Sequence, residues 1–239
     1  MQADFLSDIE LYFSPLVKGN TLIIEGNEAH HIQNVMRHLI GDEIFITDGD
    51  GSIYKTKIHS INKNSVHCKI YSTDYYINKY SNLFFCIPRL KHAERFEFAL
   101  EKCVELGITN FIAFDSKRTV AKGAKVERWE KILLSAMKQS LRAYLPKIIY
   151  VKSLTELVKL NGTKIVFDQK ANQTFQQFIS ACHQSLISNN FFFIFGPEGG
   201  FEKTEISNES LVVRLADKRL RSETAIIAAA VELTSKLFQ

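Results

Sequence analysis

The sequence lacks long hydrophobic runs, and no stretch approaches the roughly 18 apolar residues that a membrane-spanning helix needs. Its first ten residues include Asp4, Asp8 and Glu10, so they lack the basic and then apolar layout of a secretory signal. Internal repeats and low-complexity segments are also missing. We therefore expect a cytoplasmic protein that has no membrane partner.

Metal-binding patterns are also lacking. The chain has four widely separated cysteines: Cys68, Cys86, Cys103 and Cys182. None of them forms a C-x-x-C pair, so neither a zinc site nor a redox motif is indicated, and we expect reduced, mostly buried thiols. His30 and His31 are adjacent on a predicted helix and point to different faces, which is poor geometry for chelation. We expect no metal.

No charge of one sign dominates the chain. Lysine and arginine together number 30 against 26 acidic residues, which gives a net charge of +4. This balance agrees with a nucleic-acid partner but supports one only weakly. Hydrophobic residues make up 46% and charged residues 23%, close to the averages of globular proteins, so disordered and fibrous classes are excluded.

The first third of the chain has the pattern of a small β-rich domain. A helix is predicted at 28–39, because Ile32, Val35, Met36 and Leu39 fall on one helical face. A polar, tyrosine-rich linker is predicted near 74–81, so we place this domain at 1–76. The β-branched and aromatic content predicts strands at 21–25, 43–48, 52–60 and 65–72.

From residue 77 to 239 strands alternate with helices, which predicts an α/β domain with a mostly parallel sheet covered on both faces. The expected strands are 83–87, 110–114, 147–151, 164–167 and 191–195. The expected helices are 93–106, 126–141, 154–160, 173–186 and 223–238.

A glycine-rich loop, residues 196–200, directly follows the most apolar strand. Ligands of open α/β sheets bind beyond the carboxyl ends of the strands, and glycines let a ligand approach the backbone closely. The sixth residue counted from Gly196 is Phe201, so the spacing is not that of a phosphate-binding P-loop, and the loop also fails G-x-G-x-x-G. A tight turn with no ligand is the alternative.

A second candidate is the segment 215–225, which enters the last helix. Ser222 is predicted as the N-cap of that helix, with Glu223 in its first turn at the positive end of the helix dipole. Three cations stand directly before it: Lys218, Arg219 and Arg221. They form either a solvated charge run or a site for a phosphate or carboxylate ligand.

These two segments together resemble a known family. Gly196 to Phe201 with Glu205, followed by Leu215 and by the run from Leu220 to Ala225, resembles the bacterial 16S ribosomal RNA uracil-N(3) methyltransferases (RsmE type) of the SPOUT class. The stretches 89–108 and 127–146 resemble the first two helices of the family's catalytic domain. His31, Arg37 and the Gly41-Asp42 pair resemble its PUA-like domain, so the match covers almost the whole chain.

The resemblance implies a SPOUT-type, trefoil-knotted α/β domain behind a small β-barrel PUA-like domain, two subunits packed as a homodimer, and S-adenosylmethionine as methyl donor. Ala216 stands where the family commonly has Gly, and Ser222 where Thr is usual. The implied cofactor-binding residues are Gly196, Pro197, Glu198, Gly199, Gly200, Leu215, Ala216, Leu220 and Arg221.

The implied reaction is methylation of N3 of a uridine in 16S ribosomal RNA of the small subunit. It requires a cation beside the uracil carbonyls, for which Arg221 and Arg142 are candidates, and a proton acceptor, for which Glu223 and Glu198 are candidates. Each carboxylate also has a possible structural role. The residues expected to contact RNA are Arg37, Arg89, Lys91, Arg95, Gln139 and Arg142. Gln139 and Arg142 share a helix face and could instead contact the partner subunit.

Two alternatives remain open. One is a SPOUT methyltransferase that acts on another RNA, such as transfer RNA. The other is a non-catalytic RNA-binding protein in which the glycine loop is only structural.

Overall fold

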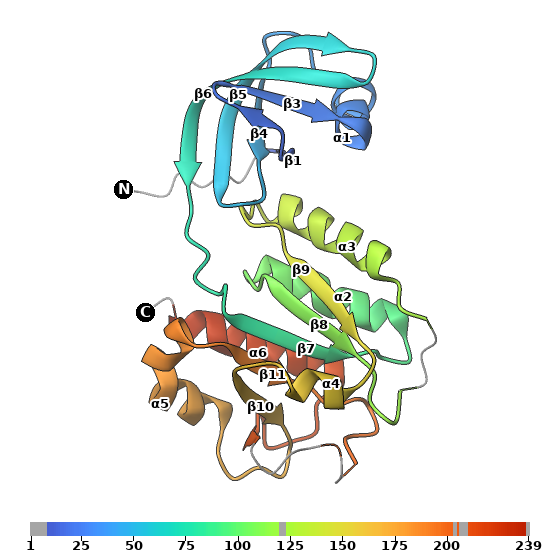
Figure 1. Ribbon diagram of the computed structural model, residues 1–239, viewed down its shortest axis with the longest axis vertical. Coiled ribbons are helices and arrows are strands. Elements are labelled where there is room, and N and C mark those ends of the chain that lie inside the picture. Colours follow the sequence, from blue (N-terminus) through green and yellow to red (C-terminus); the bar gives the residue numbers. More distant parts are fainter. Residues whose placement is uncertain (1–8, 120–122, 203–204, 206–209, 238–239) are drawn as a thin grey trace. The chain divides into compact units, whose positions relative to one another are not determined.

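The computed structural model describes residues 9–119, 123–202, 205 and 210–237 (Figure 1). The chain divides into two compact units. The first combines Met1–Asn78 with Met137–Leu145, and the second combines Lys79–Ala136 with Pro146–Gln239. None of the helices within the described ranges is long and apolar enough to cross a membrane.

The first unit is built on a six-stranded sheet with the order β1-β4-β5-β6-β3-β2. All neighbouring strands are antiparallel except β1 and β4. The register shifts twice between β5 and β6, and such irregularities bend a sheet. The strands are β1 (Leu11–Phe13), β2 (Val17–Lys18), β3 (Thr21–Glu25), β4 (Glu43–Thr47), β5 (Ser52–Asn62) and β6 (Ser65–Tyr75). The sequence did not predict β1 and β2.

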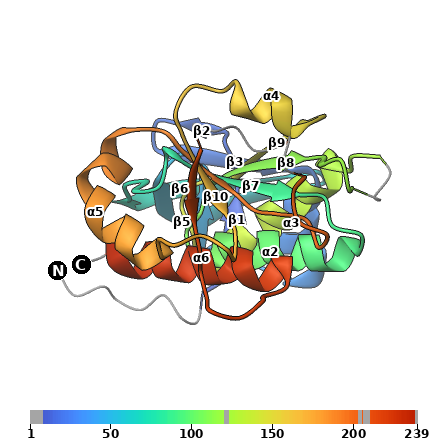
Figure 2. The ribbon, with the colours of Figure 1, turned by 90° about the horizontal axis from the view of Figure 1, so that it is seen from below.

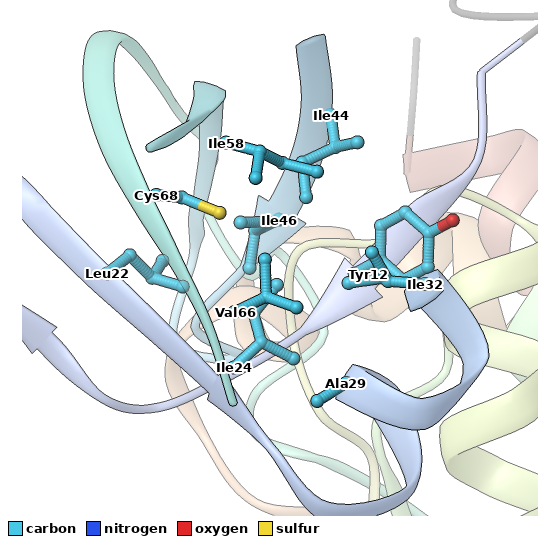
Figure 3. Close-up of a cluster of buried hydrophobic side chains, with 10 residues drawn as sticks. All are labelled: Tyr12, Leu22, Ile24, Ala29, Ile32, Ile44, Ile46, Ile58, Val66 and Cys68. Carbon is cyan, nitrogen blue, oxygen red and sulfur yellow. The ribbon is translucent and has the colours of Figure 1, made fainter. Parts of the chain in front are cut away.

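Side chains on the inward face of these strands form the main core of the first unit. Figure 3 shows aliphatic residues of β3, β4 and β5 converging on Ile32 and Ala29 of the helical segment. Leu22, Ile24 and Ile46 have no solvent exposure, as expected for the inward face of alternating strands.

The helix predicted at 28–39 is wrong in extent. The structure has a short α1 (Gly26–His30) continued by a π-helical turn, η1 (His31–Val35), and Arg37 at φ 57° ends the helical path. Ile32 is buried, but Val35, Met36 and Leu39 are 57%, 44% and 69% exposed. The π-turn changes the angular spacing between successive residues, so a 3.6-residue period does not place these three side chains on the inward face.

The segment Met137–Leu145 belongs to the first unit although it lies far along the chain. The Thr47 hydroxyl and the Gly51 N–H both donate to the Ala143 carbonyl, at 3.1 and 3.0 Å, and the Leu145 N–H donates to the Gly49 carbonyl at 2.8 Å. A Cβ at Gly49 would lie 2.8 Å from the Phe13 ring, so any larger residue would force Phe13 or the backbone to shift. The predicted boundary at residue 76 leaves this segment in the second domain.

The second unit is a parallel six-stranded sheet with the order β12-β10-β11-β7-β8-β9. Its strands are β7 (Leu83–Pro88), β8 (Asn110–Phe114), β9 (Lys147–Val151), β10 (Thr163–Phe167), β11 (Phe191–Ile194) and β12 (Leu211–Val213). Its helices are α2 (Ala93–Glu105), α4 (Leu154–Val158), α5 (Phe175–Ser188), α6 (Ser222–Leu237) and α3 (Val126–Gln139), whose last turn belongs to the first unit. The sequence predicted all of these elements except β12.

Helices cover both faces of this sheet, which explains why β11 is apolar at every position. Phe192 and Ile194 pack with Leu154 and Leu157 of α4 on one face, whereas Phe193 contacts Phe175 of α5 on the other. Helices α2 and α6 pack against each other on the face opposite α4 (Figure 2).

After β12 the chain crosses the loop that joins β10 to α5. Arg214 donates its N–H to the Gln173 carbonyl at 2.9 Å and accepts from the Phe175 N–H at 2.8 Å. The following residues then reach the end of β11 and enter α6. This crossing brings 215–222 beside the glycine loop.

Candidate functional site

One cleft of about 920 Å³ opens where β10 and β11 end, which is the edge where parallel sheets bind ligands. Its wall combines residues from 167–170, the glycine loop and 215–222, all in the second unit. The predicted cofactor-binding residues all line it: Gly196, Pro197, Glu198, Gly199, Gly200, Leu215, Ala216, Leu220 and Arg221.

Ser222 joins the two predicted segments directly. Its hydroxyl donates to the Gly196 carbonyl at 2.9 Å, and the residue is 8% exposed. The prediction that Ser222 caps α6 is wrong, because the helix begins at Ser222 and the carbonyl of Arg221 accepts the first helical bond, from Ala225. Arg221 is therefore the N-cap residue, and the Ser222 side chain fixes the glycine loop instead.

Other side chains hold the glycine loop from outside. The Glu198 carbonyl accepts a hydrogen bond from Nη2 of Arg219 at 3.0 Å, and the Gly199 carbonyl accepts one from Nη1 of Arg118. Gly200, at φ +70°, closes a turn by donating its N–H to Pro197 at 2.8 Å. The path of the loop is thus fixed by its own turn and by side chains from two other segments.

Arg95 of α2 forms ion pairs with two carboxylates at the rim of the cleft. Its Nη1 lies 3.1 Å from Oε1 of Glu198, and its Nε lies 3.7 Å from Oε1 of Glu223. Glu223 is only 12% exposed, does not line the cleft, and its Oε2 is buried without a hydrogen-bond partner among the described residues. Glu198 lines the cleft and is 39% exposed.

Cations predominate along the cleft wall. Arg221 is exposed and its side chain makes no hydrogen bond or ion pair within the described residues, so its guanidinium is available to a ligand. Lys170 and Lys218 are also exposed, and Asp168 is the one carboxylate besides Glu198 among the described lining residues. The cleft is thus suited to anionic groups, with local acidic positions.

Arg89, expected to contact RNA, is instead enclosed. Its Nε and Nη2 lie 2.5 and 2.6 Å from the two carboxylate oxygens of Asp115, its Nη1 donates to the Gly123 carbonyl at 2.7 Å, and the side chain is 7% exposed. Tyr150 donates to Asp115 at 2.7 Å. Burial acts to raise the pKa of Asp115, but the bonds from Arg89 and Tyr150 outweigh it and hold that pKa below its ordinary value. The structure therefore does not favour a phosphate contact for Arg89.

The other predicted RNA contacts divide between the units. Lys91 is exposed in the second unit, two residues before the start of α2. Arg37 and Gln139 are exposed and Arg142 is half-buried, and all three belong to the first unit, whereas the cleft lies in the second.

The end of β10 and the loop after it also line the cleft, which the sequence did not predict. Phe167, Asp168 and Lys170 line the cleft, and the Asp168 carboxylate accepts from the Lys170 N–H at 2.8 Å. The signal was present, because Asp168 directly follows a predicted strand at the edge where ligands bind. The Arg118 contact had no such signal, since Arg118 and Gly199 are 81 residues apart.

Two family models match the chain. One is described as an RNA methyltransferase domain and covers residues 79–233, and the other as an RNA methyltransferase PUA domain and covers residues 24–71.

Curated relatives match over nearly their full length. The ribosomal RNA small subunit methyltransferase E of Bacillus subtilis is 29% identical over 236 residues, covering 92% of each chain. The protein of the same name from Mesomycoplasma hyopneumoniae is 30% identical over 223 residues, covering 87% of this chain and 91% of that one.

Among solved structures, a ribosomal RNA small subunit methyltransferase E from Neisseria gonorrhoeae bound to S-adenosyl methionine aligns with a TM-score of 0.82 at 25% identity, covering 95% of this chain and 98% of that one. The expected fold class, a mostly parallel α/β domain of SPOUT type behind a PUA-like domain, is confirmed.

Proposed function

The chain belongs to the ribosomal RNA small subunit methyltransferase E family of RNA methyltransferases, and from this membership we propose that it methylates N3 of a uridine in 16S ribosomal RNA. S-adenosylmethionine is the methyl donor. The observation that carries the proposal is that two segments far apart in the chain, the glycine loop and 215–222, line one cleft.

The chemistry of the cleft fits S-adenosylmethionine. Its volume of about 920 Å³ lies in the range of ligand pockets, and its apolar residues, including Leu215 and Leu220, suit an adenine ring. Cations such as Lys218 suit the donor's carboxylate, and acids such as Asp168 suit its amino or hydroxyl groups. The added methyl of Ala216 lies within this wall and makes that side more apolar.

When bound, the donor supplies an electrophilic methyl group on a sulfonium. The protein must then orient the uracil and stabilise the charge that develops as N3 loses its proton. We assign the stabilising role to Arg221, which lines the cleft and is not engaged by other described side chains. Arg142 remains a second candidate for this role.

Of the two candidate proton acceptors, Glu198 fits better than Glu223. Glu198 lines the cleft, whereas Glu223 is nearly buried and lies against Arg95. We therefore propose that Glu198 accepts the N3 proton and that Glu223, first predicted as catalytic, holds Arg95 in place.

We propose that residues 1–76 form the RNA-binding domain and residues 77–239 the methyltransferase domain. Arg37 and Lys91, both exposed, and Arg95 at the cleft rim are the proposed phosphate contacts. The proposed substrate is the small ribosomal subunit in the cytoplasm, and the active form is a homodimer in which Gln139 and Arg142 contact RNA or the partner subunit.

The test has two steps. Calorimetric titration with S-adenosylmethionine separates an enzyme from a binding-only RNA protein, because the latter should give no heat of complex formation. Incubation with labelled donor and unmethylated small subunits, followed by mass spectrometry of nucleosides, should then reveal N3-methyluridine in 16S RNA. Methylation found only in transfer RNA would overturn the substrate assignment.

A further inference from the structure

Glu205 joins two loops of the second unit through one carboxylate. Its Oε1 accepts a hydrogen bond from the backbone N–H of Lys117 at 2.8 Å, and its Oε2 accepts one from the backbone N–H of Glu202 at 2.8 Å. The Lys117 N–H belongs to residues 115–119, which follow β8 and are called the anchor loop below. The Glu202 N–H comes two residues after the glycine loop, so Glu205 ties this loop to the anchor loop.

The anchor loop is itself firmly held. It begins at Asp115, whose carboxylate is engaged by Arg89 on both oxygens. The next residue, Ser116, is 6% exposed, accepts the Thr119 N–H at 3.0 Å and donates its own N–H to the Thr119 hydroxyl at 2.9 Å. This bidentate ion pair, with Arg89 buried, therefore gives Glu205 a fixed point of attachment.

A second contact joins the same two loops. The guanidinium of Arg118 donates to the Gly199 carbonyl, and a Cβ at Gly199 would lie only 3.2 Å from Cδ of Arg118. The anchor loop thus covers the side of Gly199 on which a side chain would project. Neither Glu205 nor any anchor-loop residue is among the described residues that line the cleft.

We propose that Glu205 is a positioning residue for methyl transfer, an inference that rests on the proposed function. It holds the glycine loop in the conformation that binds the methyl donor and does not touch the donor itself. A carboxylate suits this role because each of its two oxygens accepts one N–H, whereas a glutamine amide offers one acceptor and places an NH₂ group against the other N–H.

The test compares Glu205→Gln with Glu202→Gln, the same chemical change three residues away. Within the described part of the chain, Glu202→Gln weakens only an ion pair of 3.2 Å between exposed side chains, with Nζ of Lys117, and it keeps the backbone N–H that Glu205 accepts. We expect Glu205→Gln to raise the KM for S-adenosylmethionine and the Kd for its demethylated product about tenfold, with kcat and the KM for RNA near wild type. Glu202→Gln should leave all four within about twofold, since exposed ion pairs contribute little.

Thermal unfolding of each variant shows whether the fold is kept. If Glu205→Gln is unfolded at the assay temperature, Glu205→Asp, which keeps the charge on a shorter side chain, should show the same selective loss of donor affinity to a smaller degree. A folded Glu205→Gln that binds the demethylated donor as tightly as wild type, or that loses kcat alone, would refute the positioning role.

This outcome is distinct from failure of the proposed function. In that case the wild-type protein and Glu202→Gln would also fail to bind the donor. Because the donor-binding measurement needs no RNA, it tests Glu205 whichever RNA is methylated.

Discussion

The Ser222 hydroxyl lies 2.9 Å from the Gly196 carbonyl oxygen and thereby bonds the first residue of α6 to the first residue of the glycine loop. The two residues are 26 positions apart in sequence, and both line the cleft. This part-buried hydrogen bond, together with the one from Arg219 to the Glu198 carbonyl, therefore helps to set the separation of the two walls of the proposed donor site.

Removal of this bond should weaken donor binding. Ser222→Ala leaves the half-buried Gly196 carbonyl without its side-chain donor, a loss of about 1 kcal/mol, or roughly fivefold in the Kd for S-adenosylmethionine. Ser222→Thr keeps the hydroxyl and should bind within about twofold of wild type. Calorimetric titration of both variants checks this, and equal affinity for Ser222→Ala and wild type would contradict it.

Arg221 should matter for turnover and not for folding. Because its guanidinium is exposed and makes no bond within the described residues, Arg221→Ala should leave the unfolding temperature unchanged. If Arg221 stabilises charge in the transition state, kcat should fall about 100-fold or more. Arg221→Lys, which keeps a cation but not the planar fork, should retain part of the activity. Single-turnover rates measure this, and wild-type kcat in Arg221→Ala would remove Arg221 from the mechanism.

The Arg89–Asp115 pair should make stability depend on acid pH. The pKa of Asp115 is lower in the folded protein than its ordinary 3.8, so the ion pair stabilises the fold fully above that value. This contribution is lost as the pH falls through the folded-state pKa. Asp115→Asn should unfold more easily at neutral pH, by about 3 kcal/mol, because Arg89 is left buried without its charge partner.

The measurement for this pair is urea unfolding of wild type and Asp115→Asn at several pH values. The difference in the free energy of unfolding should shrink as the pH falls from 5 towards the acid limit of folding. A difference that stays constant over that range would show that the charge of Asp115 does not contribute.

Gly49 should be harder to replace than Gly26, another turn glycine of the first unit. Gly49→Ala places a Cβ 2.8 Å from the Phe13 ring at φ +77°, whereas Gly26→Ala, at φ +62°, meets nothing within 4 Å. Alanine is strained by the positive φ in both variants, so the difference between their free energies of unfolding isolates the steric clash. We expect Gly49→Ala to be less stable than Gly26→Ala by about 1–3 kcal/mol in chemical denaturation, and equal losses would show that the contact relaxes without cost.

Most of the second unit could be predicted because its central strands are buried on both faces. Phe191 to Ile194 is apolar at every position, which is typical of a central parallel strand, and the loop after such a strand is where ligands bind. The β12 strand escaped prediction because it has only three residues and two of them, Leu211 and Val212, are exposed at the edge of the sheet.

The remaining errors concern partners distant in sequence. Arg89 was expected to contact RNA because nothing near it in sequence identifies Asp115, 26 residues later, as its ion-pair partner. Likewise, Ser222 was predicted as a helix cap because its partner, the Gly196 carbonyl, lies far away in sequence. The local sequence pattern predicts secondary structure and the face that a residue occupies. It does not predict which loops of the folded chain cross each other.

The return of Met137–Leu145 to the first unit bears on how this protein could be divided or recombined. Cleavage after Asn78 would leave the amino-terminal fragment without a segment that supplies partners for Thr47, Gly49 and Gly51. Replacement of residues 1–78 alone by those of a relative would pack the relative's residues against the unchanged segment Met137–Leu145. The first unit can be transferred intact to another protein only if both stretches of sequence are transplanted together.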